Sequence, residues 1–154
     1  MSVKDRINSD LKAALLGGDH FKCDVLRTIK AVILNEEVAL GKREEGLEDS
    51  LVEQLIAKEL KKRHESAEIY NQADRKELAD KELNEVEILS QYLPPQLSEE
   101  EILKIIRSHA SELSIKDQSG MGQLIGSVKK QLGSSADGSV IAKLVKQVVE
   151  ENSK

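Results

Sequence analysis

The stretch QYLPPQLSEEEI, residues 91–102, interrupts a sequence that elsewhere favours helix, and it holds both prolines of the chain, Pro94 and Pro95. Proline has no amide hydrogen to donate, and it pushes the residue before it out of the α region. Leu93 and the two prolines therefore cannot lie inside a helix. The helix that approaches them is predicted to end there.

A second signal directly follows the prolines. Ser98 and Glu101 have the spacing of a capping box, and the acidic run 99–101 favours the positive end of a helix dipole. A new helix is therefore predicted to begin at about residue 99. The two signals together predict a stiff corner near residue 95.

Apolar residues recur at helical spacing on both sides of this corner, and no stretch shows convincing strand alternation. The first stripe is Val3, Ile7, Leu11 and Leu15, which Gly17 and Gly18 end. Further helices are predicted at about 19–41, 49–70, 99–113, 121–132 and 138–148, and one more runs from about residue 75 to the proline corner. The charged stretch GKREEGLED, 41–49, is expected to be a mobile loop with nothing to bury.

These patterns predict an all-α protein in two parts. Residues 1–94 are expected to form an antiparallel helical bundle. Residues 95–154 are expected to form a small three-helix unit, because each of its helices is too short to be stable alone.

Composition excludes several classes of protein. Of 154 residues, 39% are hydrophobic and 33% charged, and no apolar run approaches the roughly 20 residues that span a bilayer. The lone Cys23 allows no intrachain disulfide, and the charged N-terminus does not resemble a secretory signal, so a cytoplasmic location is expected. Phe21, Tyr70 and Tyr92 are the only aromatic residues, which argues against stacking on single-stranded bases.

No catalytic pattern emerges from the sequence. His20, His64 and His109 are scattered, and neither a metal-binding spacing nor a phosphate-binding or nucleophile motif is present. Cys23 is interpreted as a small core residue. We therefore predict no catalytic residue, no metal and no cofactor.

Charge is distributed unevenly. Residues 1–98 hold 15 basic and 20 acidic side chains, a net charge of −5, whereas residues 116–149 hold five lysines and two aspartates, a net charge of +3. Gly122 and Gly126 lie four apart in this basic stretch, so they share one helix face and admit close approach of another backbone. From spacing alone, tight helix packing and a ligand-facing role remain equally open for the glycines, and a solvated face is the simplest interpretation of the lysines.

Two other basic features have simple interpretations. Lys58, Lys61 and Lys62 make a ridge, but Glu59 stands four before Arg63, the favourable orientation for an ion pair. The amides at the start of the last helix could attract phosphate, but Asp137 is expected to cap them itself.

The chain resembles the GatB/YqeY family, and in particular the free-standing YqeY-like proteins of bacteria. The resemblance rests on residues 58–102, with YLPPQLSEEEI, and on residues 120–147, with the series MG…G…ADG. It implies that the C-terminal unit is similar to the tail of the B subunit of the tRNA-dependent amidotransferase, which touches the outer corner of tRNA without performing chemistry. The residues that this would assign to RNA binding are Gly122, Gly126, Lys129, Lys130, Lys143 and Lys146.

The resemblance leaves three functions to weigh. The first is a non-catalytic accessory protein that binds tRNA. The second is an adaptor that docks on an aminoacyl-tRNA synthetase or an amidotransferase. The third and least favoured is a carbon–nitrogen ligase that uses glutamine as amido donor, because the resemblance covers none of the amidotransferase's catalytic centres.

Overall fold

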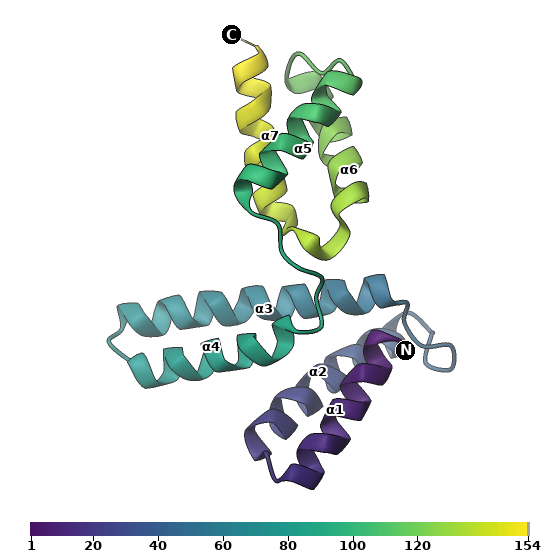
Figure 1. Ribbon diagram of the computed structural model, residues 1–154, viewed down its shortest axis with the longest axis vertical. Coiled ribbons are helices and arrows are strands. Elements are labelled where there is room, and N and C mark those ends of the chain that lie inside the picture. Colours follow the sequence, from purple (N-terminus) through teal and green to yellow (C-terminus); the bar gives the residue numbers. More distant parts are fainter. Residues whose placement is uncertain (154) are drawn as a thin grey trace. The chain divides into compact units, whose positions relative to one another are not determined.

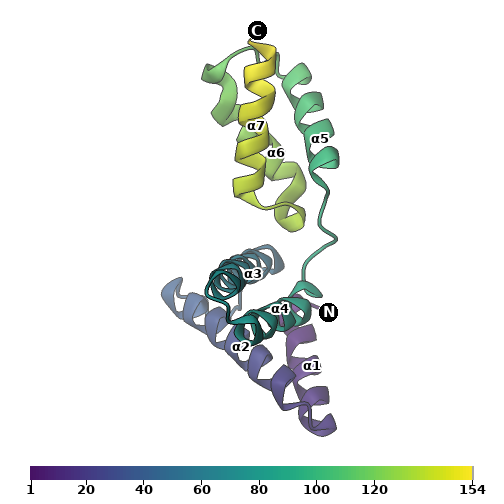
Figure 2. The ribbon, with the colours of Figure 1, turned by 90° about the vertical axis from the view of Figure 1, so that its left-hand side faces the viewer.

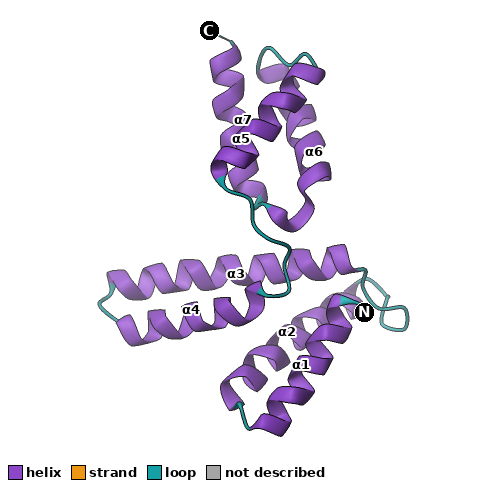
Figure 3. Ribbon diagram, in the orientation of Figure 1, coloured by secondary structure: helices purple, strands orange, loops and turns teal. Residues whose placement is uncertain are grey.

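The computed structural model describes residues 1–153, and all regular secondary structure within them is helical, which confirms the all-α class (Figure 3). The chain divides into two compact units, Met1–Leu93 and Pro94–Lys154 (Figure 1). Each unit has its own cluster of buried apolar side chains. The two clusters share no residue, so each unit has a separate core.

The first unit consists of two helical hairpins. Helices α1, Val3–Gly17, and α2, His20–Ala39, form one; α3, Asp49–Gln72, and α4, Lys76–Ser90, form the other. Figures 1 and 2 show the first hairpin laid obliquely across the second. The turn between α1 and α2 follows the sequence signals, since Gly18 adopts a φ of 72° and the Asp19 side chain accepts from the Lys22 amide.

The expected stripe on α1 was wrong at its last position. Leu15 is 51% exposed, and Ala14 is buried in its place. A helix turns once every 3.6 residues, so steps of four drift away from the buried face, and a step of three from Leu11 restores it.

The expectation that the loop at 41–49 has nothing to bury was also wrong. Leu47 lies in the core, and its backbone N–H donates to Glu37 Oε2 at 3.1 Å. The Glu37 side chain is buried and accepts from Lys4 Nζ at 2.9 Å. A carboxylate on α2 thus anchors the loop.

The proline corner begins and ends as predicted. Helix α4 ends at Ser90, and α5, Glu99–Glu112, begins after Ser98, whose hydroxyl accepts from the Glu101 amide at 3.2 Å. The carboxylate of Glu101 accepts from the Ser98 hydroxyl and not from the Ser98 amide. Only one of the two hydrogen bonds of a capping box is therefore present.

The second unit packs α5 against α6, Met121–Leu132, and α7, Gly138–Asn152. Short 3-10 turns precede and follow α6, at Gln118–Gly120 and Gly133–Ser135. The Leu97 amide donates to the Ser135 carbonyl at 2.9 Å, which fixes the segment before α5 to the connection between α6 and α7. No helix within residues 1–153 is long and apolar enough to cross a bilayer.

Candidate nucleic-acid interface

Helices α6 and α7 carry the six residues that the family resemblance implies for RNA contact. Each helix buries one apolar face, through Leu124, Val128 and Leu132 on α6 and through Ile141, Leu144, Val145, Val148 and Val149 on α7. The six residues all lie outside these faces and are exposed. We call the set the glycine–lysine surface: Gly122, Gly126, Lys129, Lys130, Lys143 and Lys146.

Its two glycines do not serve helix packing. A Cβ atom built on Gly122 or Gly126 would meet no atom within 4 Å. Gly120 behaves differently, because a Cβ there would lie 2.6 Å from Cδ1 of the buried Ile115. Close packing thus explains the glycine at Gly120, but it does not explain those at Gly122 and Gly126.

Lys129 places its charge between the two helices. A Cβ built on Gly138, the first residue of α7, would lie 3.3 Å from Lys129 Nζ. The ammonium group of Lys129 therefore lies beside the first residue of α7.

The remaining charges of the glycine–lysine surface lie on the neighbouring faces. Gly122, Gly126 and Lys129 follow helical spacings of four and three, so the bare glycine row ends at an ammonium group. Lys130 and Lys143 project directly away from the buried faces of their helices. The contact of this surface with RNA stays a prediction.

The side chain of Asp137 caps the start of α7, as the sequence predicted. Asp137 Oδ1 accepts from the Ser139 amide at 2.9 Å and from the Ser139 hydroxyl at 3.0 Å. Asp117 makes the same arrangement with Ser119 ahead of α6, and those hydrogen bonds lower the pKa of the Asp117 carboxyl. These aspartates occupy amides that phosphate would otherwise use.

A histidine fixes the opposite flank of α6. His109 on α5 contacts Ser127 Oγ through Nδ1 at 2.6 Å and Gln131 Oε1 through Nε2. Sequence reasoning missed this bridge, because its partners lie on another helix and no local spacing signals them. The bridge holds α6 against α5 and leaves its glycine flank free of that helix.

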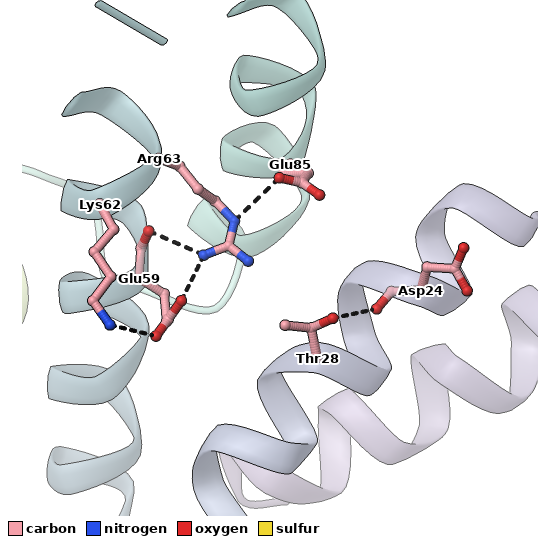
Figure 4. A network of polar contacts seen from close by, with 6 residues as sticks. All are labelled: Asp24, Thr28, Glu59, Lys62, Arg63 and Glu85. Atoms are coloured by element: carbon pink, nitrogen blue, oxygen red, sulfur yellow. Dashed lines mark hydrogen bonds and ion pairs between the residues drawn. The ribbon is translucent and has the colours of Figure 1, made fainter. Parts of the chain in front are cut away.

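The lysine ridge on α3 is partly neutralised, as its spacing indicated. Figure 4 shows Glu59 between Lys62, at 3.4 Å, and Arg63, at 2.7 Å. Arg63 also pairs with Glu85 of α4 at 3.4 Å. Burial and the charge of Glu85 raise the pKa of nearby Glu82. This network joins α3 to α4 and neutralises the part of the ridge at Lys62 and Arg63.

Candidate centres for chemistry are few in the part of the chain that the structure describes. Residues 1–153 hold no group of three or more His, Cys, Asp or Glu side chains placed to bind a metal. Cys23 is buried in the core of the first unit, as predicted.

Comparison with known proteins gives a family and three named relatives. A sequence model described as Yqey-like protein matches residues 4–149. A protein of Pyrenophora tritici-repentis, named altered inheritance of mitochondria protein 41, mitochondrial, is 28% identical over 152 residues, which cover 96% of this chain and 81% of that protein. Proteins of the same name from Clavispora lusitaniae and Kluyveromyces lactis are each 29% identical, over 88% and 62% of this chain and 81% and 52% of their own lengths.

Proposed function

Because the chain belongs to the YqeY-like protein family, we propose that it is a non-catalytic accessory protein that binds tRNA through the glycine–lysine surface of α6 and α7. The amidotransferase B subunit, whose tail the second unit resembles, provides the functional analogy. The proposal assigns no turnover to this chain.

One observation carries the proposal. Gly126 lies inside an exposed helix, where glycine costs about 1 kcal/mol relative to alanine, and open space surrounds the position of its missing Cβ. Helix packing gives no reason for this cost. A ligand whose own backbone comes close to the helix does give one, and Gly122 extends the same bare row.

The chemistry of the surface favours a structured polyanion. Lys129, Lys130, Lys143 and Lys146 are exposed and would neutralise phosphates. The second unit contains no aromatic residue for bases to stack on. Recognition by phosphate contact and by shape is how proteins bind RNA duplexes, and folded tRNA presents such duplexes.

Filter binding of bulk tRNA across a salt series tests the proposal. Four phosphate contacts predict that the logarithm of affinity falls with the logarithm of salt concentration with a slope of roughly −3. A matched single-stranded RNA should bind more weakly at each salt concentration. A flat salt response, or a preference for the single strand, would contradict the proposed mechanism.

A further inference from the structure

A second surface, on the first unit, presents apolar side chains to solvent. Leu34 is 43% exposed and Val38 is 59% exposed on α2, and Ala31 is exposed beside them. Residues 27, 31, 34 and 38 are separated by four, three and four positions, so they form one straight row. Rows with this spacing are the seams along which helices pack on other helices.

A hollow lies beside this row, between α1 and α2. Its volume is about 300 Å³, and its lining includes Lys4, Asn8, Lys30, Ala31, Leu34 and Glu37. This volume stands at the lower end of the range for binding pockets, roughly 300–1,000 Å³. A hollow of this size can receive a large apolar side chain from a partner, in the way that interface anchors are buried.

The hollow is lined by two cations, Lys4 and Lys30, and one anion, Glu37, although its unit as a whole is negative. Lys30 lies at the rim, Arg27 heads the row on α2, and Lys12 continues the line of Lys4 and Asn8 on α1 by one turn. Among residues 1–153, neither Lys12 nor Lys30 has an acidic partner within 4.0 Å.

The two salt bridges near the hollow leave the net charge around it positive. Lys4 is paired with Glu37, and Arg27 lies 3.9 Å from the exposed Asp24. Lys30 at the hollow and Lys12, one turn beyond Asn8, remain without an ion pair among the residues that the structure describes, whereas residues 1–98 as a whole carry a net charge of −5. This local positive charge therefore favours a binding partner with acidic side chains.

We propose that the α1–α2 face, defined by Lys4, Lys12, Arg27, Lys30, Leu34 and Val38, docks an acidic amphipathic helix of a partner protein. Apolar side chains of that helix cover Leu34 and Val38, with one in the hollow, and its flanking carboxylates meet Lys12 and Lys30. A second copy of this chain fits poorly, because a self-complementary contact brings two positive rims together. This inference does not rest on RNA binding, which concerns the other unit.

A synthetic peptide tests the chemistry of the surface. The probe is a fluorescent helix of roughly five turns with leucines at i, i+4 and i+7 and glutamates on both flanks. We expect the full chain to bind it in an anisotropy titration, and Leu34→Glu or Lys30→Glu to weaken binding by about tenfold or more. Leu83→Glu is the matched control, because Leu83 on α4 is 40% exposed.

Exchange of charge sharpens the peptide test. The same peptide with lysines in place of glutamates should bind Lys30→Glu more tightly than it binds the unmodified protein. The proposal is overturned if the acidic peptide does not bind, if Leu83→Glu weakens it as much as Leu34→Glu, or if both peptides bind alike.

Crosslinking in cells tests the class of partner. A photoreactive residue at position 34 should form an adduct with a protein segment that is acidic and amphipathic, and Lys30→Glu should reduce its yield. The same residue at position 83 is the control. An adduct with RNA, with lipid or with another copy of this chain overturns the proposal, and so does a yield at position 34 no higher than at position 83.

Discussion

The hydroxyl of Tyr92 donates a 2.5 Å hydrogen bond to Oδ2 of Asp10, joining the end of α4 to the middle of α1. Tyr92 is buried, and the Arg6 guanidinium carbon lies 5.4 Å from the centre of its ring. Arg6 also donates to the Gln91 carbonyl at 3.1 Å. The chain is therefore fastened to the first unit immediately before the two prolines.

Tyr92→Phe should lower the free energy of unfolding by about 1–3 kcal/mol, because it removes a hydrogen bond to a charged, half-buried carboxylate. Chemical denaturation at neutral pH measures this change. Phe21→Leu, which alters a more exposed aromatic residue, serves as the control. Equal losses in both variants would argue against the hydrogen bond as the cause.

The hydrogen bond between Tyr92 and Asp10 also predicts that the protein loses stability at alkaline pH. Burial, followed by the bond to Asp10, raises the pKa of Tyr92 well above its usual value. The folded state then holds the proton more tightly, so this contribution is intact below the ordinary pKa of about 10 and is lost as pH rises above it. Between about pH 10 and 12, the free energy of unfolding should fall less steeply in Tyr92→Phe than in the unmodified protein. Parallel curves for the two proteins would exclude the mechanism.

Lys4→Met should destabilise the first unit more than Glu37→Gln does. Removal of Lys4 leaves a buried carboxylate with only the Leu47 amide, and an uncompensated buried charge costs about 3–5 kcal/mol. Glutamine in place of Glu37 keeps an acceptor and buries no charge. Urea unfolding of both variants gives the order, and the reverse order would show that Glu37 gains little from Lys4.

The glycines of the second unit should respond in opposite directions. Gly126→Ala should raise stability by about 1 kcal/mol, and Gly122→Ala by less, because Gly122 lies in the first turn. Gly120→Ala should lower stability by about 1 kcal/mol or more, because its Cβ clashes with buried Ile115. Thermal unfolding measures all three.

The stabilising variants also separate folding from binding. Gly126→Ala should weaken tRNA binding while the protein becomes more stable, because a methyl group holds the RNA backbone away. Unchanged affinity would remove the close-approach role of the glycine row.

Lys129→Glu and Lys146→Glu should each weaken tRNA binding and reduce the magnitude of the salt slope by about one. Lys104→Glu makes the same change of charge on the exposed side of α5 and is the matched control. Binding constants measured at several salt concentrations decide the matter. Equal effects of all three variants would indicate a response to net charge rather than to a defined surface.

A fragment of residues 94–154 should fold by itself. Its core contains 13 buried apolar residues, none of them from the first unit. Chains of about 60 residues fold alone but with little margin, so low stability is expected. Cooperative thermal unfolding followed by circular dichroism would support this. A fragment without a transition would show that the second unit depends on the first.

The sequence determined the helices, the corner and most helix ends, because their causes are local. A proline without an amide hydrogen, a serine or aspartate at a helix start and a glycine at φ above zero act within a few residues of themselves. The signals at Pro94, Ser98, Asp19 and Gly18 could therefore be read directly.

Tertiary structure decided which side chains meet across the chain, because such contacts depend on packing between distant segments. The link between Tyr92 and Asp10 spans 82 positions, and no periodicity announces it. Leu47 lies in the core because a carboxylate of α2 reaches its amide. Gly120 packs closely and Gly126 does not, although the two glycines look alike in the sequence, because only Gly120 faces a buried side chain of its own unit.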